Sequence, residues 1–170
     1  MSFLKSLFGR PASQSSLPAL YNSVVAEARA PHWYREGAAP DTLDGRFDMV
    51  AAVLAFVLLR MEKLGASDDS ARLAEIFVDD MDGQLRQIGV GDLVVGKHIG
   101  RMMSALGGRL GTYRAALAGE SSLEDALERN VYRGSAPAPA AVEHVAAGLR
   151  ALAVRLEGVS LEDLRAGRMG

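Results

Sequence analysis

One stretch of the chain limits the possible folds more than any other: the eleven uncharged apolar residues from Met49 to Leu59, which stand between Asp48 and Arg60. A helix that crosses a membrane needs about 20 such residues, so this stretch is too short to span one. In a helix its apolar side chains would cover nearly every side, and such a helix is stable only when other elements surround it. The sequence therefore predicts a buried central helix from about residue 44 to residue 64.

The other segments also show helical rather than alternating periodicity, and they end at glycine or proline. The segment 31–44 is rich in proline, glycine and aspartate, which predicts an irregular loop. We therefore expect an all-α fold, a single compact helical domain of about six helices with a central apolar helix. The further helices are expected over residues 17–29, 67–88, 92–117, 122–132 and 138–156, with a last turn after Ser160.

Three helix starts carry a side chain that can accept a hydrogen bond from a free backbone amide. Thr42 or Asp44 is placed to cap the central helix. Ser122 and Ser160 are each followed three residues later by an aspartate, which is close to the spacing of a capping box. The sequence thus predicts where these helices begin.

The length of 170 residues suits one domain with a substantial core. Residues 1–16 contain Pro11 and several serines and are expected to form a flexible N-terminal segment. We expect the helical domain over residues 17–134, and a linker with C-terminal helices that pack on the same domain over residues 135–170.

The first ten residues have a basic and apolar character. Apolar side chains at helical spacing beside Lys5 and Arg10 indicate a short amphipathic segment that contacts a membrane or a partner. A resemblance to a mitochondrial transit peptide and a frayed terminus are the alternatives. The candidate membrane-contact residues are Phe3, Leu4, Leu7 and Phe8.

The helix over residues 92–117 has a long apolar stripe that five glycines interrupt: Gly96, Gly100, Gly107, Gly108 and Gly111. Each costs about 1 kcal/mol relative to alanine in a helix interior. A close approach of another helix at Gly100 and Gly107–Gly108 would compensate for this cost, and a kink is the alternative.

Composition and motifs exclude several classes of function. The net charge of -2 argues against a general attraction to nucleic acid, so no DNA partner is expected. The chain has no cysteine, which excludes disulfides, thiolate metal sites and thiol catalysis. His32, His98 and His144 are far apart and lack metal-ligand spacing, so no metal or other cofactor is expected. No nucleotide-binding glycine loop or nucleophile elbow appears, and we predict that the protein is not an enzyme.

The acidic cluster from Asp79 to Asp82 offers an alternative. Paired aspartates on a helix can hold magnesium and a diphosphate, but here Gly83 stands where the D-D-x-x-D motif needs its last aspartate. The simpler interpretation is a solvated charged face with a pair between Asp82 and Arg86. The alternative hypothesis is a helical protein that handles a small ligand or an isoprenoid through this cluster.

Three blocks of the chain together resemble the ubiquinol–cytochrome c chaperone family. They are residues 21–34 (YNSVVAEARAPHWY), residues 39–48 (APDTLDGRFD), and residues 77–117 with DDMD at 79–82, LRQIGVGDL at 85–93, GK at 96–97 and GR at 108–109. The resemblance covers roughly Tyr21 to Leu117, and the order and spacing of its blocks match the family pattern. The tail after Gly134 shows no resemblance.

The resemblance implies an assembly chaperone that binds cytochrome b and promotes biogenesis of the ubiquinol–cytochrome c reductase complex, respiratory complex III. Mitochondrial members act with a small partner protein and associate with the ribosome, which leaves ribosome association open for this chain. The chain looks like the alphaproteobacterial form. It would then act in the cytoplasm, peripherally at the inner face of the inner membrane, or in the matrix if the source is eukaryotic. A small-molecule ligand is not expected.

The family pattern also places charged residues around an apolar surface, as a protein that binds by surface complementarity requires. These residues are our candidates for partner contacts, although Asp48 and Asp92 also stand where helix caps or first turns are expected. The candidates are Arg46, Asp48, Asp79, Asp82, Arg86, Asp92 and Lys97.

Overall fold

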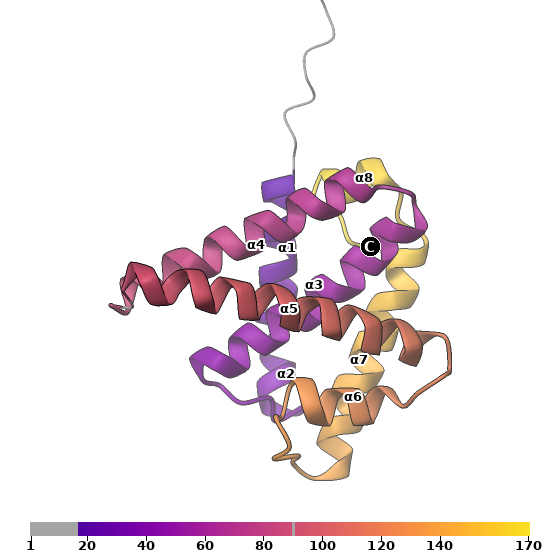
Figure 1. Ribbon diagram of the computed structural model, residues 1–170. Coiled ribbons are helices and arrows are strands. Elements are labelled where there is room, and N and C mark those ends of the chain that lie inside the picture. Colours follow the sequence, from indigo (N-terminus) through magenta and orange to yellow (C-terminus); the bar gives the residue numbers. More distant parts are fainter. Residues whose placement is uncertain (1–16, 90) are drawn as a thin grey trace, which may run out of the picture.

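The computed structural model describes residues 17–89 and 91–170, with residues 92, 93 and 95 in their backbone only. Six of its helices have eight or more residues, and the described residues include no strand, so the expected all-α fold is confirmed (Figure 1). The helices are α1 (Leu17–Ala28), α2 (Pro31–Arg35), α3 (Leu43–Lys63), α4 (Ser67–Gln87), α5 (Asp92–Leu117), α6 (Leu123–Asn130), α7 (Pro139–Glu157) and α8 (Leu161–Arg165).

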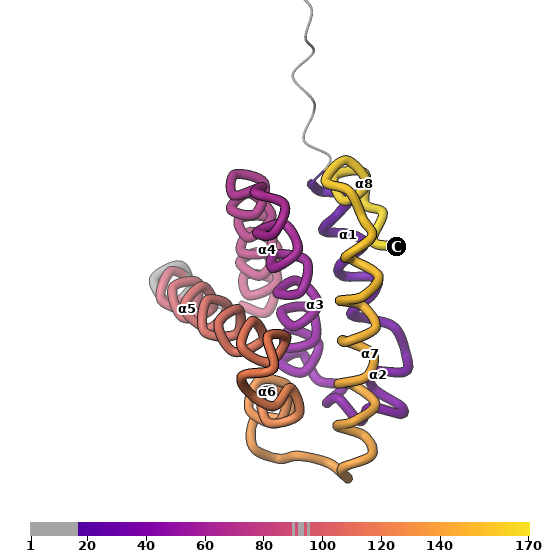
Figure 2. The backbone as a smooth tube through the Cα atoms, turned by 90° about the vertical axis from the view of Figure 1, so that its right-hand side faces the viewer, coloured from indigo at the N-terminus to yellow at the C-terminus, as the bar shows by residue number. Residues whose placement is uncertain are grey.

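Helix α3 is the centre of the fold. It packs against α1, α4, α5 and α7, and the side view in Figure 2 shows it between α4 and α7. Every residue from Met49 to Leu59 is at most 6% exposed. The predicted central apolar helix is therefore confirmed, and the absence of a polar face is explained by neighbours on all sides. No described helix is long and apolar enough to cross a membrane.

The predicted caps determine where three helices begin. The hydroxyl of Thr42 accepts a hydrogen bond from the Gly45 amide at 3.0 Å. Ser122 and Ser160 accept from the amides of Asp125 and Asp163, each at 3.1 Å. These bonds satisfy amides that lack partners within the first turn of a helix.

The composition of segment 31–44 predicted an irregular loop, and this is wrong in part. Pro31 begins the short helix α2. A proline is favoured in a first helical turn since its missing amide would have no partner there. The indole of Trp33 is fully buried and donates to the Glu27 carbonyl at 2.7 Å. Gly37 follows closely, and a Cβ added there would lie 2.6 Å from the Trp33 carbonyl oxygen.

The end of α4 with the turn after it and the first half of α5 form an arm, residues 82–89 and 91–103, whose tip lies away from α1, α3 and α7 (Figure 1). It carries three large apolar side chains that are strongly exposed: Ile88 (61%), Val94 (49%) and Met103 (41%). This arm contrasts with the body, which we define as α1, α3, α7 and α8.

The expected helix approach at the glycines of α5 is wrong. A Cβ added to Gly96, Gly100, Gly107, Gly108 or Gly111 would meet nothing within 4 Å. All five glycines are exposed, so no neighbouring helix compensates for their cost.

The C-terminal helices pack on helices that precede them in the chain. Helix α7 packs against α3 and α6, and α8 packs against α1 (Figure 2). The predicted N-terminal segment, with the candidate membrane contacts Phe3, Leu4, Leu7 and Phe8, lies outside the described residues.

Candidate functional site

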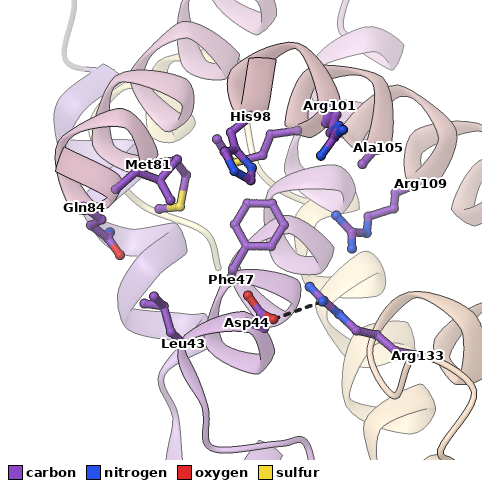
Figure 3. Close-up of a pocket in the computed structure, with 12 residues that line it drawn as sticks. Leu43, Asp44, Phe47, Met81, Gln84, His98, Arg101, Ala105, Arg109 and Arg133 are labelled. Carbon is purple, nitrogen blue, oxygen red and sulfur yellow. Dashed lines mark hydrogen bonds and ion pairs between the residues drawn. The ribbon is translucent and has the colours of Figure 1, made fainter. Parts of the chain in front are cut away.

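A groove with a volume of about 450 Å³ lies where the start of α3 meets α4, α5 and the turn after α6 (Figure 3). Its apolar lining consists of Leu43, Phe47, Met81, Leu85, Met102 and Ala105. Its polar lining consists of Asp44, Gln84, His98, Arg101, Arg109 and Arg133. Three arginines and one aspartate thus give the groove wall a net positive charge.

Phe47 occupies the middle of the groove. Its ring packs against the buried Phe77 ring, with 5.5 Å between the centroids. The guanidinium carbon of Arg109 lies 5.4 Å from the centroid of the Phe47 ring, a geometry that allows a cation–π interaction. Figure 3 shows both side chains pointing into the same space.

Asp48, the next residue, is fully buried behind the groove. Its Oδ1 accepts a hydrogen bond from Arg109 Nη2 at 2.6 Å, and its Oδ2 accepts from Arg133 Nε at 2.7 Å. Burial raises the pKa of the Asp48 carboxyl, and the two arginines act against that shift. The carboxylate joins α3, α5 and the turn after α6, and so fixes the relative position of three groove walls.

Arg133 adopts a backbone conformation that few side chains favour. Its φ is 51°, and Gly134 follows with a φ of 81°. A left-handed residue other than glycine costs about 1 kcal/mol or more, so other interactions must hold it. Besides Asp48, Arg133 binds Asp44, with Nη1 at 3.1 Å from Oδ2. These ion pairs account for the turn that brings Arg133 to the groove.

Arg109 is a buried cation that uses only part of its hydrogen-bonding capacity. Its side chain is 9% exposed, and Nη2 donates to Asp48 and, at 3.3 Å, to the Asn130 carbonyl. Among the described residues its Nε and Nη1 have no hydrogen-bond partner. A guanidinium has five N–H donors, so three of them lack an acceptor. Leaving a buried donor unpaired costs about 1–3 kcal/mol.

None of the six candidate contact residues whose side chains the structure describes lines this groove. Arg46 is exposed and pairs with Asp41 at 2.7 Å. Asp79 and Lys97 are exposed, while Asp92 begins α5 and its side chain is not described. Asp48 lies in the interior, where a partner would reach it only if the surrounding helices separated.

The acidic cluster on α4 does not converge on one point. Asp80 accepts a hydrogen bond from the Tyr21 hydroxyl at 2.7 Å, which ties α4 to α1. Asp82 pairs with Arg86 at 2.9 Å, as the helical spacing predicted. Within residues 17–89 and 91–170, no three acidic or histidine side chains gather as a metal site would require. The geometry therefore favours a structural and surface role for this cluster.

Sequence reasoning missed Arg101, Arg109 and Arg133 as groove residues. One signal pointed to Arg109: it follows Leu106 by three residues and precedes Tyr113 by four, on the inward face of α5. A charge at such a position needs a buried partner. No comparable signal marked Arg133, whose place depends on the turn after α6.

Comparison with known proteins agrees with the resemblance in the sequence and extends it. The model of the family described as "Ubiquinol-cytochrome C chaperone" matches residues 35–169, and thus includes the C-terminal helices that showed no resemblance by themselves. The crystal structure of the Cbp3 homolog from Brucella abortus is similar, with a TM-score of 0.76 and 31% identity over 89% of this chain and 86% of that chain. No curated protein shows significant similarity. The match over most of the chain, in sequence and in fold, shows that this helical protein belongs to the ubiquinol–cytochrome c chaperone family.

Proposed function

We propose that the protein binds cytochrome b and so promotes biogenesis of ubiquinol–cytochrome c reductase. The observation that carries this proposal is membership of the family, whose role is to assist assembly of respiratory complex III. A chaperone role fits a non-enzymatic protein that acts by binding a protein client.

The arm is the part of the surface best suited to such a client. It exposes Ile88, Val94 and Met103, and exposed apolar side chains next to charged ones are typical of protein-binding surfaces. Several charged residues that match the family pattern lie on or beside the arm, and we propose them as contacts with the client: Asp79, Asp82, Arg86, Asp92 and Lys97. Arg46 would contribute from α3, and Asp48 would act indirectly by holding the groove walls.

The proposed place of action is the cytoplasmic face of the inner membrane, where the protein would be held peripherally. The basis is the basic and apolar character of residues 1–10, which are outside the described part of the chain. Removing residues 2–10 should leave folding unchanged and weaken flotation with liposomes. Equal flotation of the full-length and shortened proteins would contradict this placement.

The binding proposal is tested by crosslinking in the native host. A tagged protein should enrich cytochrome b from membranes relative to an unrelated membrane protein present in the same input. The double variant Asp79→Arg, Lys97→Glu should reduce this enrichment, while Glu157→Lys, an exposed change on α7, should not. Deleting the gene should lower the haem b absorbance of the complex and its subunit levels. Normal haem b and subunit levels in the deletion strain would refute the proposal.

A further inference from the structure

The groove beside Phe47 has a feature that its internal contacts leave unexplained. Arg109 is about nine-tenths buried, and three of its N–H donors have no acceptor among the described residues. Its side chain points into a groove whose wall also contains Arg101 and Arg133. The one acidic lining residue, Asp44, already pairs with Arg133.

We propose that this groove binds a polypeptide segment in which an acidic residue is flanked by large apolar side chains. The carboxylate would accept hydrogen bonds from the free donors of Arg109, with Arg101 adding charge at the rim. The apolar side chains would pack on Phe47, Met81 and Met102. This rests on the proposed function, because the segment would belong to the client.

The shape and lining of the groove favour a polypeptide over a lipid. Its volume of about 450 Å³ holds a few apolar side chains, but not both acyl chains of a phospholipid. Met81 and Met102 are unbranched and flexible, which lets one surface fit different side chains. Leu43, at the edge of the groove, is 53% exposed, so a bound chain can continue past it to the outside.

A second groove beside α5 provides an internal comparison. It has a volume of about 320 Å³ and is lined mainly by small and apolar residues of α3, α4 and α5. Its one charged lining residue, Glu62, pairs with Arg114 at 2.7 Å. This groove therefore lacks the net positive charge of the groove beside Phe47, although α3, α4 and α5 line both.

The test uses the purified full-length chain and fluorescein-labelled overlapping peptides that tile cytochrome b of the same host. Fluorescence anisotropy should show binding by peptides that contain an acidic residue next to large apolar ones. Replacing that residue by its amide should weaken binding about tenfold or more, because hydrogen bonds to a charged group are the strong ones. An unchanged affinity for the amide peptide would overturn the proposal.

Two matched variants of the chaperone make the test specific to the groove. Ala105→Trp fills the groove, whereas Ser104→Trp adds the same side chain at the neighbouring exposed position outside it. Both should retain the helical circular dichroism of the parent. Only Ala105→Trp should abolish peptide binding, and equal binding by the two variants would show that the groove is not the site. Arg101→Gln should give a smaller loss.

Vesicles of phosphatidylcholine with phosphatidylglycerol distinguish the lipid alternative. If Ala105→Trp abolishes vesicle binding while no peptide binds the parent protein, the groove is a lipid site and the proposal is wrong. A strain that carries Ala105→Trp separates this proposal from the proposed function. Normal haem b in that strain, together with a haem b defect in the deletion strain, would refute the groove as the client site and leave the proposed function intact.

Discussion

Helices α3 and α5 both carry long runs of apolar residues, yet their surroundings in the fold differ. Helix α3 has neighbours on all sides, and eleven successive residues are almost fully buried. In α5 only Leu106, Arg109 and Tyr113 are buried among the described side chains. Helix α3 is therefore held by packing on all sides, while α5 is held along one face. We infer that changes in the body affect folding first and changes in the arm affect binding first.

The largest contrast is expected from truncating one apolar side chain in each region. Phe56→Ala in α3 removes a ring that is 2% exposed and packs against Tyr113 with 5.5 Å between centroids. It should lower the free energy of unfolding by about 3–5 kcal/mol because a cavity remains. Met103→Ala in the arm should change it by less than about 1 kcal/mol. Urea unfolding followed by circular dichroism measures both changes in free energy. Similar losses of stability in the two variants would contradict the contrast between body and arm.

Removing the buried charge that joins α3 to α5 should have nearly as large an effect on stability. Asp48→Asn leaves Arg109 buried without its carboxylate, and the loss of one member of a buried pair costs about 3 kcal/mol or more. The control is Asp41→Asn, which breaks the exposed pair with Arg46 and should cost at most about 1 kcal/mol. If both variants unfold at the same urea concentration, the Asp48 carboxylate does not hold α5 to α3.

Replacing a glycine by alanine should change the stability of the protein in opposite directions in the two regions. In the body, a Cβ at Gly148 would lie 2.6 Å from the Trp33 ring, so Gly148→Ala should destabilise the protein by about 1–3 kcal/mol. In the arm, Gly100→Ala meets open space and should stabilise it by up to about 1 kcal/mol. Thermal unfolding of the two variants tests this, and a loss of stability for Gly100→Ala would show that the arm makes a contact at that glycine.

The smallest expected effect is a pH dependence of stability at the contact between α2 and α7. His32 of α2 and His144 of α7 lie with ring nitrogens 3.0 Å apart. Burial, followed by the neighbouring His144, lowers the pKa of His32 below its usual 6.5, although Glu27 and Glu36 act in the opposite direction. The folded state therefore binds a proton less readily than the unfolded state, and stability should fall as the pH drops below about 6.5.

Hydrogen exchange at pH 7.5 and pH 5.5, both about one unit from the usual histidine pKa, locates this effect. After division by the intrinsic exchange rate at each pH, the protection of amides in α2 and α7 should fall at the lower pH, while that of the arm should stay unchanged. The variant His144→Gln should show a smaller difference between the two conditions. An equal difference in that variant would mean that the histidine pair is not the cause.

Local patterns in the sequence were enough to predict most of the secondary structure. The helix boundaries around α3, α4 and α5 agree with the structure within about two residues, the usual uncertainty of such boundaries. The caps at Thr42, Ser122 and Ser160 were visible because capping depends on residues at most three positions apart. Helix α2 was missed because its five residues are too short to show a period.

The candidate site was much less predictable. The exposed charges Asp79 and Lys97 could be chosen from the family pattern, and their contact role stays a prediction. The groove itself combines residues of α3, α4, α5 and the turn after α6, which are far apart in the chain. Burial of Asp48 and the left-handed turn at Arg133 decide which charges meet there.

The sequence by itself determined the helical class, the central position of α3 and the family, because each depends on periodicity, on local composition or on motifs that can be read along the chain. Only the tertiary structure decided that the glycines of α5 face open space and that Arg109 points into a groove with donors unpaired. The physical reason is that the direction of a helix face depends on which other helices pack against it. That choice is made by contacts between residues distant in the chain, and no local pattern records it.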